Sequence, residues 1–228
     1  MIMTVVLDFD GVVTRHGEFA KELAWDKLAA DALEPEEQKI QEKFMAILKQ
    51  KRELYGQGKA KGDRYDILRD SLKELGCSKE KLELKVTLYA SRYNDLVQQL
   101  VLAGGLSEGA EKALEELCTV ASLYINSATP EDAVQQSVKT LGIDKYFKAV
   151  FGRPRTKQEN LYVVAGLEKI SAQELLFVGD GSGDEKAAQD VGCMFVGFSN
   201  AWNKWENKSF PLIHDLGELI PHCKRGYK

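Results

Sequence analysis

Cysteine is scarce and scattered in this 228-residue sequence, and no two cysteines are spaced as a CxxC pair. A zinc knuckle and a dithiol redox centre both need closely spaced thiols, so neither is indicated. Isolated cysteines are typical of a protein that keeps its thiols reduced, and we therefore expect a cytoplasmic location. The four residues are Cys77, Cys118, Cys193 and Cys223.

The sequence also lacks a long hydrophobic run and an excess of positive charge. The apolar stretch near the N-terminus runs directly into Asp8 and Asp10, so it predicts neither a signal peptide nor a membrane span. Thirty-one Lys and Arg against thirty-five Asp and Glu give a net charge of −4, which disfavours nucleic acid or an anionic membrane as a partner. We therefore expect no nucleic-acid partner and no membrane partner, and small-molecule chemistry instead.

Histidine is equally scarce, and several signature motifs fail. His16, His214 and His222 are isolated, and no serine or cysteine elbow accompanies them, so a hydrolase triad has little support. The glycine-rich segment 179–184 lacks the third glycine of a dinucleotide fingerprint. The same segment also lacks the later glycine and glutamate of a calcium-binding loop.

Short apolar runs that alternate with helical segments predict the fold. The first run, Met3 to Phe9, is rich in β-branched residues and is followed by Gly11, as expected of a strand that is buried on both faces. Four more strands are expected after Gly105, separated by helices as in βαβ units. They lie at about 120–125, 149–151, 175–178 and 194–198. The sequence thus predicts an α/β protein with a doubly wound parallel sheet.

A long helical block separates the first predicted strand from the others. From about 19 to 103 the sequence is rich in Lys and Glu, with apolar residues at helical spacing. The clearest stripe contains Val86, Tyr89, Tyr93, Leu96 and Leu100. A second helix is expected after an Asp63 cap and before Gly76.

The first strand cannot bury itself alone, so we expect it to pair with the later sheet and the helical block to form an inserted domain. The predicted core domain comprises residues 1–15 and 105–228, and the predicted all-α cap domain comprises residues 16–104. The insertion follows the carboxyl end of a strand, which is the edge where open α/β sheets bind ligands.

Two acidic pairs follow predicted strands. Asp8 and Asp10 alternate at the end of the first strand, which places them on one side of the chain. Asp180 and Asp184 follow the strand at 175–178. Like charges this close need a proton or a cation between them, and a set of carboxylates without histidine or thiolate suits Mg²⁺.

A hydroxyl and a lysine complete the expected set at the same edge. Ser127 ends the second core strand just before a helix N-terminus, where backbone N–H groups favour an anion. Lys157 follows the next strand and adds a cation, although Lys148, Arg153 and Arg155 compete for that role. Carboxylates, a hydroxyl and a cation together are what phosphoryl transfer requires.

The segments DFDGVVT, INSATP and GDGSGD, with Lys157 between the last two, resemble the four motifs of the haloacid dehalogenase-like hydrolase superfamily. The insertion after the first motif is similar to the helical cap of its phosphoglycolate phosphatase and β-phosphoglucomutase branch. This resemblance implies a Mg²⁺-dependent phosphatase that hydrolyses a small phosphorylated metabolite through an aspartyl-phosphate intermediate.

The resemblance also implies roles for individual residues. Asp8 is the expected nucleophile and Asp10 the general acid and base. The remaining contacts to the phosphoryl group are expected from Ser127, Lys157, Gly11 and Ala128.

For Mg²⁺, the resemblance implies three ligands, the Asp8 carboxylate, the Asp10 backbone carbonyl and Asp180. Asp184 is expected to act through water or to position Lys157.

Several alternatives remain at this point. The dehalogenase members lack the second aspartate, and the phosphonate-cleaving members usually differ there, so Asp10 disfavours both. A phosphomutase keeps both aspartates and stays open, as does a non-catalytic phosphate-binding regulatory protein.

Some of the residues named above also have simple structural explanations. Asp184 can be a plain helix cap, and Thr129 is expected to be the N-cap of the helix that Pro130 opens. Trp202 and Trp205 are expected to serve in packing rather than to wall the site. Lys59, Lys61 and Arg64 are cations that could recognise the substrate, or they could equally belong to a solvated loop. His16 lies just past the first motif.

Overall fold

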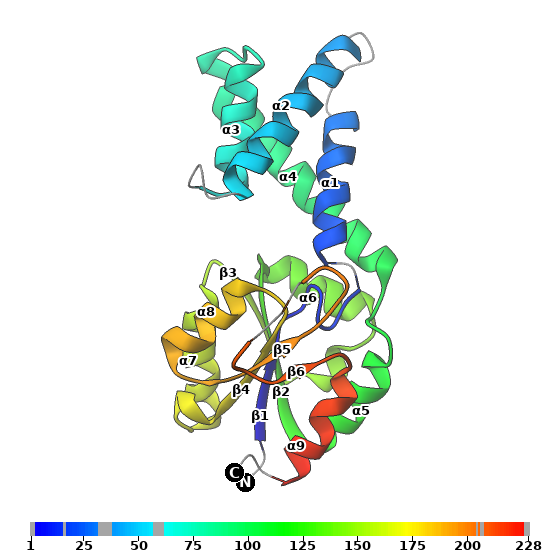
Figure 1. Ribbon diagram of the computed structural model, residues 1–228, viewed down its shortest axis with the longest axis vertical. Helices are drawn as coiled ribbons and strands as arrows, with labels where there is room; N and C mark the ends of the chain where they lie inside the picture. Colours follow the sequence, from blue (N-terminus) through cyan, green and yellow to red (C-terminus); the bar gives the residue numbers. More distant parts are fainter. Residues whose placement is uncertain are drawn as a thin grey trace. The chain divides into compact units, whose positions relative to one another are not determined.

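The structure is a computed structural model that describes residues 3–15, 17–31, 38–56, 62–203, 205 and 208–225. The chain divides into two compact units. The core unit comprises Met1–Glu18 and Val101–Lys228, and the cap unit comprises Phe19–Leu100. Figure 1 labels the helices and strands of both units.

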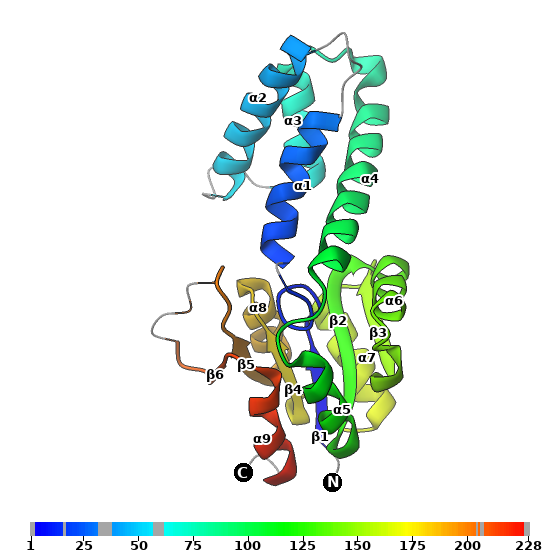
Figure 2. The same ribbon diagram turned by 90° about the vertical axis from the view of Figure 1, so that its right-hand side faces the viewer.

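A six-stranded sheet forms the centre of the core unit, with the strand order β3-β2-β1-β4-β5-β6. Figure 2 shows the strands side by side in this order. All neighbouring strands pair in parallel, so their carboxyl ends lie at one edge. The strands are β1 (Met3–Leu7), β2 (Ala121–Pro130), β3 (Ala149–Arg153), β4 (Leu175–Gly179), β5 (Met194–Phe198) and β6 (Leu212–Ile213).

The predicted α/β fold class is confirmed, and the five predicted strands are present. The first strand does pair with the later sheet, because β1 lies between β2 and β4 and is buried along its whole length. The sequence does not predict β6, because two residues are too few to show an alternating or β-branched pattern.

Helices cover both faces of the sheet. Helices α7 and α8 pack together on one face, whereas α5 and α9 pack together on the other (Figure 1). The apolar layer beneath α7 includes Leu161 and Val164, which lie in one buried cluster with Val6 and Phe177 of the sheet. The core helices are α5 (Ala110–Val120), α6 (Glu131–Thr140), α7 (Lys157–Glu168), α8 (Ser182–Val191) and α9 (Ile220–Arg225), with short 3₁₀ turns at Asp144–Tyr146, Ala172–Glu174 and Leu216–Leu219.

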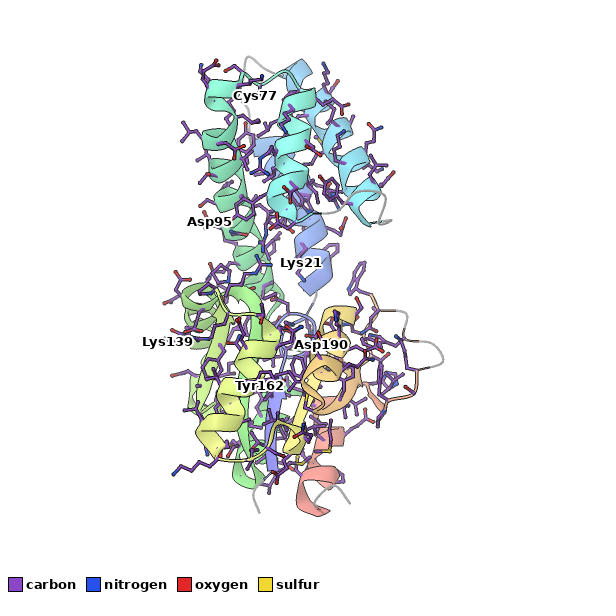
Figure 3. All side chains as sticks on the ribbon, turned by 90° about the vertical axis from the view of Figure 1, so that its left-hand side faces the viewer. Lys21, Cys77, Asp95, Lys139, Tyr162 and Asp190 are labelled. Carbon is purple, nitrogen blue, oxygen red and sulfur yellow. The ribbon has the colours of Figure 1, made fainter. Side chains whose placement is uncertain are left out.

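The start of α7 is fixed by a capping box. The Thr156 side chain accepts a hydrogen bond from the Glu159 N–H, and the Glu159 carboxylate accepts one from the Thr156 N–H. Further along the first turn, Gln158 donates to Asp190 of α8, a residue labelled in Figure 3. These contacts make Lys157 the first residue of the helix and hold that end of α7 against α8.

The cap unit consists of helices around its own apolar core. Four residues of the predicted stripe on α4, Val86, Tyr89, Tyr93 and Leu96, are buried there with less than 8% exposure, and Leu100 is partly buried. These side chains pack with Trp25, Phe44, Leu68 and Leu72 from the other helices. The cap helices are α1 (Gly17–Asp31), α2 (Gln38–Gly56), α3 (Arg64–Glu74) and α4 (Lys79–Gly104).

The predicted ends of α3 are confirmed. Asp63 is the N-cap, and its carboxylate accepts a hydrogen bond of 2.8 Å from the Tyr65 N–H. Gly76 follows the helix with a φ of 93°, a left-handed conformation that glycine adopts without steric cost. None of the helices in the described part of the chain combines the length and hydropathy that a membrane crossing requires.

Candidate active site

Three aspartates meet at the carboxyl edge of the sheet. Asp8 follows β1, Asp180 follows β4, and Asp184 lies in the first turn of α8. One carboxylate oxygen from each lies within 4.8 Å of the others. Asp8 and Asp184 are only 6% and 2% exposed, so the negative charges of this cluster are poorly solvated. Such a cluster needs compensating positive charge.

Lys157 supplies part of that compensation. Its Nζ lies 2.8 Å from Asp8 Oδ1 and also forms an ion pair with Asp184. Burial lowers the pKa of Lys157, but the two carboxylates outweigh this effect and raise the pKa above the ordinary lysine value. The Lys157 side chain therefore remains a cation at neutral pH.

The competing basic residues bind elsewhere. Lys148 forms an ion pair with Glu168, and Arg155 forms one with Glu131. Arg153 is the exposed last residue of β3. Lys157 is thus the member of this group that contacts the aspartates.

Asp184 is both a helix cap and a partner of Lys157. Its Oδ2 accepts a hydrogen bond of 3.0 Å from the Gly181 N–H, while its Oδ1 accepts one from Lys157 Nζ. Burial and the nearby charge of Asp8 raise the pKa of Asp184, although Lys157 and the Gly181 N–H oppose this. Both roles considered from the sequence, a helix cap and a partner of Lys157, are therefore present, one at each oxygen of the Asp184 carboxylate.

The loop after β5 holds Asp180 at its side chain and at its backbone. Asn200 Nδ2 donates to Asp180 Oδ2 at 2.7 Å and to the Gly11 carbonyl at 3.2 Å. The Asp180 carbonyl accepts from Asn203 Nδ2 at 3.1 Å and from Trp205 Nε1 at 2.9 Å. The two asparagines were not among the predicted site residues. Their position just after a strand, at the same edge of the sheet, was the signal that could have indicated them.

The two tryptophans in this loop differ. Trp205 packs against Phe195 and Phe210, with ring centroids 6.0 and 4.8 Å away, in agreement with the predicted packing role. Its indole N–H also contacts the site, because it donates a hydrogen bond to the Asp180 carbonyl. For Trp202 the predicted packing role is wrong, because its side chain is 48% exposed and lines a cavity of about 290 Å³ together with Gly11, His214 and other residues of the core unit.

Gly11 is required by the close approach of its loop to Asp180. Its φ is 87°, and a Cβ at this position would lie 2.1 Å from Asp180 Oδ2. The Gly11 N–H donates to the Thr14 carbonyl at 3.1 Å. The phosphate contact expected of Gly11 stays a prediction.

The prediction that Thr129 caps α6 is wrong. The N-cap is Pro130, because β2 continues as far as that residue and keeps Thr129 extended. Thr129 Oγ1 instead donates to Asp10 Oδ2 at 3.2 Å. Ser127 is buried, and its Oγ accepts a hydrogen bond of 3.1 Å from the Thr129 N–H. Ala128 lies between them and is exposed.

Several other residues considered from the sequence lie outside the described residues or in the cap unit. His16, Lys59 and Lys61 lie outside the described residues. The side chain of His222 does too. Arg64 belongs to the cap unit, where its guanidinium donates to Asn94 and lies over the Tyr93 ring.

The donor set fits a divalent cation. All three side chains of the aspartate cluster offer carboxylate oxygens, which are the ligands of hard cations such as Mg²⁺ rather than of soft metals. Because Asp8 and Asp184 are buried and the cluster carries more carboxylates than Lys157 can neutralise, a bound cation would balance its charge.

The chain also matches known proteins in sequence. A sequence model of the haloacid dehalogenase-like hydrolases matches residues 2–192. A phosphoglycolate phosphatase from Yersinia pestis is 34% identical over 108 residues, which is 43% of this chain and 46% of that protein. The chain thus spans less than half the length of the curated relatives it matches.

Solved structures share the fold over nearly the full chain. The HAD-hydrolase YfnB from Bacillus subtilis, bound to magnesium, has a TM-score of 0.67 and 20% identity, with 97% of this chain and 98% of that chain covered. A β-phosphoglucomutase from Clostridium difficile has a TM-score of 0.64 and 19% identity, with 99% and 96% covered. The motifs, the sheet and the sequence match agree, and the chain belongs to the haloacid dehalogenase-like hydrolase family.

Proposed function

We propose that the protein is a Mg²⁺-dependent phosphatase that hydrolyses a small phosphorylated metabolite through an aspartyl-phosphate on Asp8. The observation that carries this proposal is the buried Asp8 carboxylate, 2.8 Å from the Lys157 ammonium and within 4.8 Å of the Asp180 and Asp184 oxygens. A nucleophile held beside a fixed cation is the arrangement that attack on a phosphorus atom requires.

In the first step, an Asp8 oxygen attacks the phosphorus atom of the substrate. The new bond between Asp8 and phosphorus forms as the bond from phosphorus to the ester oxygen breaks. Asp10 donates a proton to the departing alkoxide, and Thr129 orients the Asp10 carboxyl group through the hydrogen bond of 3.2 Å. The Lys157 ammonium and the Ser127 hydroxyl bind the phosphoryl oxygens.

In the second step, water replaces the released alcohol. Asp10, now ionised, takes a proton from this water as the water oxygen attacks phosphorus. The bond between Asp8 and phosphorus breaks, which releases inorganic phosphate and restores the Asp8 carboxylate. The Asp10 carboxyl group is then protonated again and ready for another substrate.

Mg²⁺ is the proposed cation, held by the Asp8 and Asp180 carboxylates together with the Asp10 backbone carbonyl. When bound, it neutralises negative charge on the phosphoryl group. Asn200 fixes the Asp180 carboxylate, and Lys157 with the Gly181 N–H fixes Asp184. Asp184 thus positions Lys157 and would contribute negative charge to the cation site.

The proposed substrate class is a small phosphomonoester. The curated relatives named above are phosphoglycolate phosphatases, so phosphoglycolate is the first compound to test. Sugar phosphates and nucleoside monophosphates complete the panel, and an aryl phosphate reports the basal chemistry.

The test measures phosphate release from this panel with and without Mg²⁺, for the wild type and Asp8→Asn. We expect release that requires Mg²⁺ and is lost in Asp8→Asn, because the amide is not a nucleophile. Asp144→Asn is the matched control, since Asp144 is exposed in the 3₁₀ turn that precedes β3, away from the carboxyl edge of the sheet.

Other outcomes would contradict the phosphatase. Conversion of a sugar phosphate to its isomer without phosphate release, dependent on a bisphosphate activator, would indicate a phosphomutase. Metal-dependent binding of phosphorylated compounds without turnover would indicate a regulatory protein.

A further inference from the structure

Two asparagines form a buried amide pair beneath the site. Asn126 lies on β2 and Asn160 on α7, and both are 0% exposed. Asn160 Nδ2 donates to Asn126 Oδ1 at 3.0 Å. Burying two amides is costly unless their hydrogen-bonding groups are paired, so the contacts of this pair define what it does.

The pair holds the backbone of Lys157. Asn126 Nδ2 donates to the Lys157 carbonyl at 2.9 Å. Asn126 directly precedes Ser127, and Lys157 is the first residue of α7. One hydrogen bond therefore joins the strand that carries the hydroxyl to the helix that carries the ammonium.

The far side of the pair holds the segment that leads into α7. Asn160 Oδ1 accepts from Arg155 Nε at 2.8 Å, and Asn160 Nδ2 also lies 3.5 Å from the Gly152 carbonyl. Glu131 completes the network, because its Oε2 accepts from Arg155 at 2.6 Å and from the Gly152 N–H at 3.2 Å. The chain before Lys157 is thereby fixed to β2, to α6 and to α7.

Stability alone does not account for such a pair. Two apolar side chains of similar volume would fill the same space without the cost of desolvating the amides. What apolar side chains cannot supply is a directional contact to the Lys157 carbonyl. The amide pair therefore fixes the backbone of Lys157, at the start of α7, relative to β2.

We propose that Asn126 and Asn160 are positioning residues that set Lys157 for its contact with the phosphoryl group, an inference that rests on the proposed function. Asp8 and Asp184 hold the Nζ end of Lys157, and Asn126 holds its backbone end. The asparagines touch neither substrate nor metal and act through Lys157. A displacement of about 1 Å in a group of this kind costs on the order of 100-fold in rate.

The test uses two isosteric variants and a matched control. Asn126→Asp removes the donor to the Lys157 carbonyl, and Asn160→Asp removes the donor to Asn126 while it keeps the acceptor for Arg155. Tyr124→Phe is the control, because Tyr124 lies two residues before Asn126 on the same strand. Its hydroxyl binds Glu168 rather than Lys157.

The first measurement does not depend on turnover. An amine-reactive ester labels lysines, and peptide mapping follows Lys157, whose side chain is 16% exposed, against Lys148, which is 56% exposed. We expect labelling of Lys157 to become several-fold faster in both asparagine variants and to stay unchanged in Tyr124→Phe. Labelling of Lys157 at the wild-type rate in a folded asparagine variant would overturn the inference. If one asparagine variant fails to fold, the labelling result for the other variant decides.

The second measurement separates the inference from the proposed function. With an aryl phosphate and Mg²⁺, we expect kcat to fall by about 10- to 100-fold in the asparagine variants and the affinity for inorganic phosphate to weaken, with Tyr124→Phe near wild type. If the asparagine variants are active with unchanged kcat and phosphate affinity, the inference about the asparagines is overturned and the proposed function is not. An inactive wild type would contradict the proposed function, and the labelling result would still decide the position of Lys157.

Discussion

The Thr129 hydroxyl donates a hydrogen bond of 3.2 Å to Asp10, across 119 positions of sequence. This contact joins the end of β2 to the loop after β1. It also fixes one oxygen of the carboxyl group that we propose as the general acid and base.

Loss of this hydrogen bond is expected to slow catalysis. Thr129→Val keeps the β-branched shape that suits the end of a strand but removes the donor. We expect kcat for an aryl phosphate to fall about tenfold or more, since positioned proton transfer contributes on the order of 10²–10⁴-fold in total. Thr140→Val is the control, because Thr140 is exposed on α6 and its hydroxyl donates to the Gln136 carbonyl. Equal kcat in the two variants would contradict the role of Thr129.

The Asn200 contact to Asp180 is expected to support metal binding. Asn200→Ala leaves the Asp180 carboxylate without its donor at 2.7 Å, and partners of this kind typically contribute 10- to 100-fold to metal affinity. We therefore expect the Kd for Mg²⁺, measured by calorimetry, to rise at least tenfold. A Kd within twofold of the wild type would show that Asn200 does not orient the ligand.

Trp205 is expected to report metal binding by its fluorescence. Its indole N–H donates to the Asp180 carbonyl at 2.9 Å. A cation bound to the Asp180 carboxylate would therefore change the electric field at the indole ring. We expect Mg²⁺ to alter the tryptophan emission of the wild type and of Trp202→Phe, but not of Trp205→Phe. A response of the same size in Trp205→Phe would contradict the role of Trp205 as the reporter.

The acidic cluster is expected to lower stability as pH rises in the absence of metal. Burial and Asp8 raise the pKa of Asp184, so the folded state binds its proton more tightly than the unfolded state does. The contribution of Asp184 to the free energy of unfolding therefore decreases as pH rises from the ordinary carboxylate pKa to above the raised value.

Urea unfolding in EDTA at pH 4.5 and 7.5 tests this sign. Between these two values, we expect the wild type to lose about 1–3 kcal/mol relative to Asp184→Asn, which lacks the titrating group. Mg²⁺ should restore stability to the wild type at pH 7.5. A difference between the two proteins that does not change with pH would contradict the raised pKa.

The cysteines are expected to differ in reactivity. Burial raises the pKa of Cys193 and of Cys223 to about 11, so little thiolate forms at either at pH 8. Cys118 is exposed on α5. With iodoacetamide at pH 8, peptide mapping should show Cys118 modified at least tenfold faster than Cys193 or Cys223. Comparable rates at all three would contradict the burial of these thiols.

The sequence predicted the parts of the fold and site that leave a local pattern. Five strands, the stripe on α4 and the ends of α3 follow from periodicity and capping residues. The placement of Asp8, Asp180 and Lys157 followed from a topological rule, because parallel strands bring their carboxyl ends to one edge.

The contacts that the sequence did not predict are tertiary. Thr129 resembles an N-cap in sequence, and only its contact with Asp10 shows its other role. Asn200 lies beside Gly11 and Asp180 because β5 pairs with β4, a relation that no local pattern records. The Asn126 pair likewise depends on where α7 crosses β2.

The most direct test of the central claim is detection of a phosphoryl group on Asp8. The protein is mixed with Mg²⁺ and an aryl phosphate, quenched with acid during turnover, digested and analysed by mass spectrometry. We expect the peptide that contains Asp8 to carry one acid-stable phosphoryl group, which is absent in Asp8→Asn and lost at alkaline pH. Phosphate release without any phosphoryl group on Asp8 during turnover, or unchanged release by Asp8→Asn, would contradict the proposed mechanism.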